Sequence, residues 1–171
     1  MTTDDQSKAG GMTARYAAVQ LAAFAVGAAF LLVGILGFIP GITTDYDTMT
    51  FAGHETGAHL LGIFEVSILH NIVHLAFGVA GLLLARTFNG ARSFLIGFGI
   101  IYLVLWLYGL QIDFEKPINF VPVNNADNWL HFALGAVMVL LGVLLSRRDA
   151  TPRTPWNQNT RGRPLGHRLA G

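Results

Sequence analysis

Long apolar stretches alternate with shorter polar links along most of the chain. The stretches cover about residues 16–39, 66–85, 94–112 and 128–145. Each has roughly the 17–25 residues that a helix needs to cross a hydrocarbon core of about 30 Å. Strands of a membrane β-barrel would be about ten residues long and would alternate in polarity. The pattern predicts an all-α, integral membrane four-helix bundle, because a chain in lipid must satisfy its own backbone hydrogen bonds.

Basic residues gather on one side of this predicted bundle. With four spans, the N-terminal segment, the link between the second and third spans and the C-terminal tail share a side. They hold Lys8, Arg15, Arg86, Arg92, Arg147, Arg148, Arg153, Arg161, Arg163 and Arg168. Only Lys116 falls on the other side, whose acidic residues are Asp45, Asp47, Glu55, Asp113, Glu115 and Asp127. Basic links favour the cytoplasm, so the N and C termini are predicted to be cytoplasmic.

Polar segments flank and connect the spans. Residues 1–15 are predicted to be a polar cytoplasmic segment and residues 16–146 the transmembrane domain. Residues 147–171 are predicted to be a disordered basic cytoplasmic tail, because they have too few apolar groups to fold. The first apolar stretch is interpreted as a retained span, since it lacks a signal-peptide cleavage site. In the first outer loop, residues 54–65, HETGAHLLGIFE, are predicted to form an interfacial helix.

Composition narrows the class of protein further. Hydrophobic residues make up 53% of the chain and charged residues 12%, about half of the roughly 25% usual in soluble domains. The lack of cysteine excludes disulfides, thiolate metal sites, iron–sulfur clusters and a cysteine nucleophile. The sequence has no Gly-rich phosphate loop or nucleophile motif, and its basic residues are explained by topology rather than by nucleic-acid binding. No span has a charged residue near its middle, which disfavours a pump or secondary transporter.

Three histidines provide the candidate chemistry. His70 and His74 are one helical turn apart and so lie on one face of the second span. His70 and His131 stand equally far along the chain from Arg86 and Arg147, which puts both about 24 Å from the inner boundary. If the second and fourth spans pack together, the three histidines meet in the outer third of the bundle. Close above them would lie Asn71, Asn128, Asp127 and Glu65.

One interpretation of these residues is a hydrogen-bonded cluster that fixes the pairing of the second and fourth spans. His70 or His74 would bond across to Asn128, Asp127 or His131. Such bonds contribute on average roughly 0.6 kcal/mol each in a bilayer. The cluster would then organise the bundle and have no catalytic residues.

A second interpretation is a metal site. Two imidazoles one turn apart can reach one zinc, copper or iron ion. The ligands would be His70, His74, His131 and Asp127, with Glu65 or water as the alternative fourth. Against this, Asn71 occupies the position at which zinc peptidase helices carry glutamate.

A third interpretation is a b-type haem between the second and fourth spans. His131 would bind one face of the iron, and His74 or His70 the other. Gly78 and Gly135, one turn deeper than His74 and His131, would let the macrocycle approach the helices. His70 and His74 cannot ligate both faces of one haem from a single helix.

The remaining polar and aromatic residues are interpreted as structural. Gln20 in the first span is predicted to make an interhelical hydrogen bond. His54 and His59 are interpreted as solvated loop residues. The aromatic residues interpreted as packing residues and interfacial anchors are Tyr102, Trp106, Tyr108 and Trp129.

A weak internal repeat links the second and fourth spans. His74 and His131 each begin the pattern His-x-Ala-x-Gly, in HLAFG and HFALG. Both patterns lie on spans that run from outside to inside. A duplicated helical hairpin is one interpretation, and a chance match in apolar sequence is the other.

Two motifs carry a resemblance to a known family. LHN-x-x-HL covers residues 69–75, and ADNWLH covers residues 126–131. Together they resemble a bacterial family, common in high-GC Gram-positive bacteria, of small four-span membrane proteins described as a domain of unknown function. The resemblance covers about residues 16–145. It implies a four-helix membrane fold and brings no established activity.

The sequence thus favours a multi-pass protein of the bacterial cytoplasmic (inner) membrane. The preferred function is a non-enzymatic accessory or assembly subunit, with an outer-side His/Asn/Asp cluster between the second and fourth spans. Its partners would be the lipid bilayer and other membrane protein subunits. The alternative is a metal- or haem-binding membrane redox protein using His70, His74 and His131.

Overall fold

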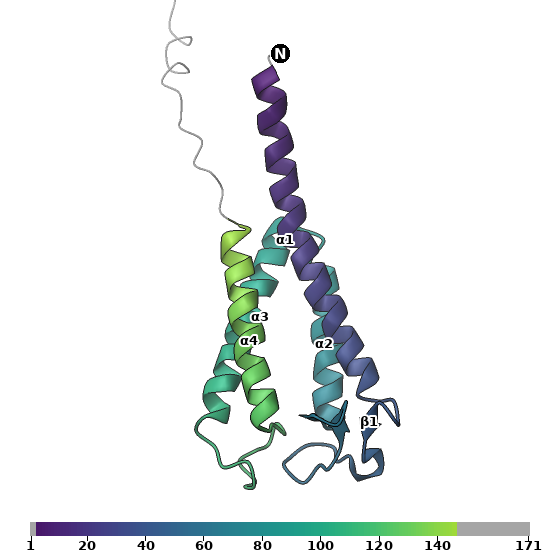
Figure 1. Ribbon diagram of the computed structural model, residues 1–171. Coiled ribbons are helices and arrows are strands. Elements are labelled where there is room, and N and C mark those ends of the chain that lie inside the picture. Colours follow the sequence, from purple (N-terminus) through teal and green to yellow (C-terminus); the bar gives the residue numbers. More distant parts are fainter. Residues whose placement is uncertain (1–2, 147–171) are drawn as a thin grey trace, which may run out of the picture.

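Four helices make up most of the part of the chain that the computed structural model describes, residues 3–146. They are α1 (Thr3–Leu36), α2 (Ile68–Leu84), α3 (Phe88–Gly109) and α4 (Asn125–Leu144), and Figure 1 shows them side by side. Three are long and apolar enough to cross a membrane, through Ala18–Leu36 of α1 and the whole of α3 and α4. The shorter apolar α2 has 17 residues, or about 25 Å of helix. Three to four such helices are the mark of a multi-pass membrane protein, and the all-α prediction is confirmed.

Helix ends are set by capping residues, so the helices differ in length from the apolar stretches. α3 begins at Phe88 rather than at the expected residue 94, because the Thr87 side chain accepts a hydrogen bond from the Gly90 N–H at 3.1 Å. Ser67 caps α2 in the same way, accepting from the His70 N–H. α1 begins at Thr3, so most of the predicted N-terminal polar segment continues the first helix. The predicted tail of residues 147–171 lies outside the described residues.

The helices pack as two antiparallel hairpins, α1 with α2 and α3 with α4. The hairpins converge near the link between α2 and α3 and diverge toward the end that carries the longer loops (Figure 1). They meet chiefly through α1 and α3, and the buried side chains there include Phe30, Phe94 and Tyr102. The expected packing of the second span on the fourth is therefore wrong. α2 and α4 are diagonal in the bundle and are not a closely packed pair.

Small residues allow the helices of each hairpin to approach closely. A Cβ atom added at Gly27 of α1 would lie 3.0 Å from the backbone carbon of Gly81 in α2. One added at Gly135 of α4 would lie 2.9 Å from the backbone oxygen of Gly99 in α3. Such close backbone contact is typical of membrane helices, where van der Waals packing replaces the hydrophobic drive. The predicted interhelical bond of Gln20 is confirmed at the end of α2, since its Nε2 donates to the carbonyl of Ala85, the C-cap residue, at 3.1 Å.

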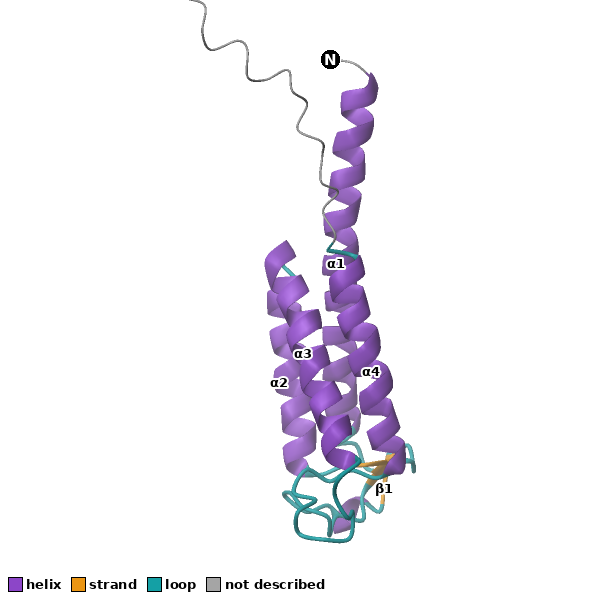
Figure 2. Cartoon of the chain, turned by 90° about the vertical axis from the view of Figure 1, so that its left-hand side faces the viewer, coloured by secondary structure: helices purple, strands orange, loops and turns teal. Residues whose placement is uncertain are grey.

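The first long loop folds into a small sheet instead of the expected interfacial helix. β1 (Thr43–Thr44), β2 (His59–Leu60) and β3 (Phe64–Glu65) pair antiparallel in that order, and a short 3₁₀ helix covers Tyr46–Thr48. The prediction of a helix over residues 54–65 is wrong because Leu61 and Gly62 both have positive φ, at 56° and 71°. This left-handed pair turns the chain back on itself between β2 and β3. The sheet lies at the loop end of the bundle (Figure 2).

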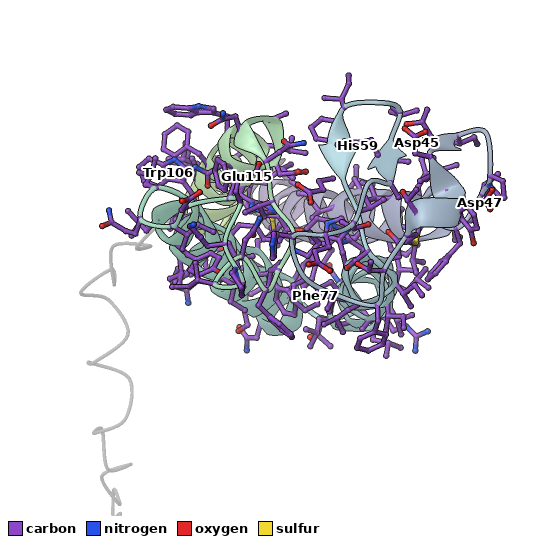
Figure 3. The ribbon with its side chains drawn as sticks, turned by 90° about the horizontal axis from the view of Figure 1, so that it is seen from below. Asp45, Asp47, His59, Phe77, Trp106 and Glu115 are labelled. Atoms are coloured by element: carbon purple, nitrogen blue, oxygen red, sulfur yellow. The ribbon has the colours of Figure 1, made fainter. Side chains whose placement is uncertain are left out.

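Charges are divided between the two ends of the helices. Arg86 and Arg92 lie at the end of the bundle where the link joins α2 to α3. The loops at the other end carry Lys116 and most of the described acidic residues. Seen from that end, Asp45, Asp47 and His59 lie over the hairpin of α1 and α2 (Figure 3). Glu115 lies over the other hairpin (Figure 3).

Candidate functional site between the hairpins

His74 is the centre of the polar contacts between the hairpins. Its Nδ1 lies 3.0 Å from the backbone oxygen of His70, and its Nε2 lies 3.1 Å from the hydroxyl of Tyr102. A carbonyl oxygen only accepts, so Nδ1 carries the proton and the Tyr102 hydroxyl donates to Nε2. Both ring nitrogens of His74 are therefore bonded to protein groups, and the bond from Tyr102 joins α2 to α3.

Tyr102 connects this bond to the rest of the cluster. Its ring stacks on Phe30 of α1 with centroids 5.4 Å apart and planes 6° from parallel. Its other neighbour is His131 of α4, which meets it edge to face at 5.1 Å. His131 thus reaches the group through an aromatic contact, and the predicted hydrogen bond from His70 or His74 to α4 is wrong.

The three candidate histidines line one cavity. It has a volume of about 220 Å³, and Tyr102 forms part of its wall with His70, His74 and His131. The rings of His70 and His74 are 4.2 Å apart. Phe77, one turn further along α2, lies on the side of that helix that faces α3 (Figure 3) and packs on Phe98 at 4.6 Å. The structure thus brings together at one cavity the three histidines that the sequence singled out.

A metal ion or haem would meet a different donor set from the expected one. Within residues 3–146 no group of three or more His, Cys, Asp or Glu side chains is arranged to hold a metal ion. Both nitrogens of His74 are already bonded, so ligation would require displacing Tyr102. His70 and His131 are left as candidate donors. The metal and haem interpretations stay predictions.

Asp127 belongs to a helix cap rather than to the cavity wall. Its Oδ2 accepts from the Asn124 N–H at 3.1 Å, and the Asn124 side chain accepts from the Asp127 N–H at 3.0 Å. This reciprocal capping box starts α4. The same Oδ2 also accepts from the Glu65 N–H at 2.9 Å, which ties β3 to α4. Asp127 therefore holds the loop sheet onto the helix, and it is not brought together with the three histidines at the cavity.

Glu65, the alternative fourth ligand, lies beside this cap at the loop end. Partial burial raises the pKa of its carboxyl group above its usual range, because water is removed from the charged form. The nearby His59 acts in the opposite direction, and Glu115 adds repulsion that raises the pKa further. Glu65 also lies outside the cavity wall.

Asn71 packs against Gly37, just after the end of α1, and Asn128 packs against Gly109, the last residue of α3. A Cβ atom at Gly37 would overlap the side-chain amide of Asn71, and one at Gly109 would overlap that of Asn128. The Asn71 Nδ2 also contacts the sulfur of Met49 at 3.8 Å. These amides are wedged between helices, so they act as packing residues.

The two hairpins repeat these contacts at matched positions. Asn71 on Gly37 corresponds to Asn128 on Gly109, and the edge-to-face pair of Phe30 with His74 corresponds to that of Tyr102 with His131. The separation from Gly37 to Gly109 equals that from Phe30 to Tyr102. Likewise, the separation from Asn71 to Asn128 equals that from His74 to His131.

Tyr102 and Phe30 are the residues that sequence reasoning missed. Tyr102 was interpreted as a packing residue or interfacial anchor, yet it is buried and donates the bond that joins the hairpins. Aligning the first and third spans on Gly37 and Gly109 would have placed Tyr102 opposite Phe30 and next to a histidine. That alignment is the signal that could have found both.

Comparison with known proteins identifies a family without an assigned activity. The family described as a domain of unknown function, DUF4383, matches residues 20–144. The resemblance to a domain of unknown function is thereby confirmed. Comparison with curated proteins and with solved structures finds no match.

Proposed function

The chain belongs to the DUF4383 family, and we propose that it is a four-span protein of the bacterial cytoplasmic membrane with both termini in the cytoplasm. Its function is that of a non-enzymatic accessory or assembly subunit, in a family typical of high-GC Gram-positive bacteria. The His/Tyr cluster organises the bundle and has no catalytic residue. Large apolar side chains on the outside of the helices, such as Leu21, Val104 and Leu140, suit lipid or the helices of a partner subunit.

The observation that carries this proposal is the double hydrogen bonding of His74. A catalytic or ligating imidazole needs a free nitrogen, whereas His74 donates to His70 and accepts from Tyr102. Asp127 is likewise bonded to two backbone N–H groups. The matched contacts of the two halves support a duplicated hairpin whose polar residues hold helices together.

The proposed topology rests on the division of charge between the two ends. Because the chain has no cysteine, single cysteines can report which side of the membrane each link faces. Asp47→Cys and Glu115→Cys, both at exposed loop positions, are expected to react with a membrane-impermeant maleimide in intact cells. Asn89→Cys, exposed near the link between α2 and α3, is expected to react only after lysis. Labelling of Asn89→Cys in intact cells would contradict the proposed orientation.

Tyr102→Phe tests whether the cluster holds the hairpins together. The change removes the donor to His74 Nε2 and leaves a buried acceptor unpaired, so we expect a loss of about 0.5–2 kcal/mol in the free energy of unfolding. Unfolding of the purified protein in mixed micelles, followed by circular dichroism, measures it. Tyr46→Phe is the matched control, since the Tyr46 hydroxyl makes no hydrogen bond within the described residues. If the two variants were equally stable, the hydrogen bond from Tyr102 to His74 would not hold the hairpins together.

The second candidate function is a metal- or haem-binding redox protein. The observation that favours it is that Nδ1 of His70 and Nδ1 of His131 are buried without a hydrogen-bond partner in the described structure. A Soret band lost in His131→Ala would support haem, and stoichiometric metal lost in His70→Ala would support a metal site. A purified protein that is folded, colourless and free of metal would contradict the redox function and favour the accessory role.

A further inference from the structure

We propose that the cavity between the hairpins is a binding site for a lipid-soluble, one-ring molecule that carries oxygen acceptors or hydroxyls, of the quinone or quinol class. The inference goes beyond the accessory role. It concerns binding alone and includes no electron transfer. Three features carry it: unpaired imidazole nitrogens, the size of the cavity and the side on which it opens.

The imidazole nitrogens supply the polar contacts. His131 is 6% exposed and lines the cavity, and within residues 3–146 neither of its ring nitrogens makes a hydrogen bond. Nδ1 of His70, on the opposite helix, is buried and equally without a partner. Buried polar groups are nearly always paired, because an unpaired one costs roughly 1–3 kcal/mol. A ligand with an oxygen at each site would satisfy both.

The size of the cavity selects a single ring. An apolar cavity of about 150 Å³ holds one benzene molecule. The volume of about 220 Å³ therefore has room for one ring with substituents. Much of the remaining wall is apolar and includes Phe77, Leu105 and Pro122, which suits the faces of a ring.

Two partly exposed apolar side chains of the cavity wall give it a side that suits entry from the bilayer. It is partly open, and its wall includes Val73 of α2 and Ile101 of α3. These two side chains are 37% and 42% exposed on apolar helices. A molecule entering between them comes from the hydrocarbon phase. The occupant is therefore lipid-soluble.

Neutral imidazoles can form hydrogen bonds with the oxygens of both the quinone and the quinol. An imidazole N–H donates to a quinone carbonyl, and the unprotonated nitrogen accepts from a quinol hydroxyl. Tyr102 holds His74 in one tautomer, so the free groups are those of His70 and His131. The described part of the cavity wall has no lysine or arginine, so an anionic headgroup would gain no ion pair there.

Binding of decyl-1,4-benzoquinone to the purified full-length protein, measured by calorimetry in detergent, tests the proposal. Decylbenzene is the matched probe, with a six-membered carbon ring and the same alkyl chain but without oxygen. We expect the quinone to bind saturably and about tenfold more tightly than decylbenzene, because its oxygens pair with the histidines. Equal affinity for the two probes would show a site for apolar chains and would overturn the proposal, as would absence of binding.

Variants of the cavity separate the site from partition into the detergent. His131→Leu is expected to weaken quinone binding about tenfold, and His131→Gln, which keeps a donor and an acceptor, much less. Ile101→Trp should block the opening without touching a histidine. Its control is Ile100→Trp, whose side chain is exposed but outside the cavity wall. Unchanged binding in Ile101→Trp would overturn the site even if His131→Leu failed to fold.

Discussion

Alanine at Gly37 or at Gly109 is expected to lower the free energy of unfolding by about 1–3 kcal/mol, the usual cost of overpacking a well-filled core. The added Cβ would overlap the Asn71 amide in the first case and the Asn128 amide in the second. Neither asparagine can move aside easily, because both are almost fully buried between the helices of their hairpin. Each change would therefore push the two helices apart or force the amide out of its site.

Gly97→Ala is the matched control for these two variants. No atom lies within 4 Å of a Cβ added at Gly97, which is exposed in the middle of α3. Because alanine has a higher helix propensity than glycine by about 1 kcal/mol, this variant should be neutral or slightly more stable. Thermal or detergent-induced unfolding of the three purified variants gives the comparison. If Gly37→Ala and Gly109→Ala were as stable as Gly97→Ala, the asparagine contacts would not limit the helix spacing.

Asp127→Ala is expected to destabilise the protein by about 2–4 kcal/mol. The carboxylate oxygen accepts from the backbone N–H groups of Asn124 and Glu65, and each partly buried donor left unpaired costs roughly 1–3 kcal/mol. The loss should also release the loop sheet from α4, which faster proteolysis of the first long loop would reveal. Unfolding curves of the purified variant give the change in free energy.

Asp127→Asn distinguishes this capping role from the predicted metal-ligand role. The amide keeps an acceptor oxygen, so it should retain most of the stability that alanine loses. Asp47→Ala, at an exposed loop position, is the control for loss of an acidic residue and should change little. A variant Asp127→Asn that was as unstable as Asp127→Ala would contradict the capping account. If metal bound to the native protein were lost in both, the carboxylate would be a ligand.

The sequence predicted the helices well because their physical signal is local. An apolar run of sufficient length is a helix in lipid wherever it lies, and counting residues from the basic boundary gave the common depth of His70 and His131. Helix ends were less accurate, since they depend on caps such as Thr87 rather than on hydropathy. The extension of α3 into the polar residues after Thr87 follows from that difference.

Contacts between helices were predicted poorly. The depth of a residue in the bundle does not say how its helix is rotated about its own axis or which helix is its neighbour. Two residues at one depth meet only if their helices are neighbours and turn the right faces toward each other. Here α2 and α4 are diagonal, so His74 meets Tyr102 of α3. Asp127 was assigned to the histidines for the same reason, although its spacing from Asn124 fits a capping box. The loop sheet depends on the left-handed conformation of Leu61, which its side chain does not favour.

The stacked pair of Phe30 and Tyr102 makes the two halves of the molecule interdependent. Each ring faces the histidine of its own hairpin edge on, and the two rings lie flat against each other. A shift of either ring therefore reaches His74 and His131 together. Phe30 lacks the hydroxyl group of Tyr102, so of these two rings only Tyr102 donates a hydrogen bond to the histidine of the other hairpin.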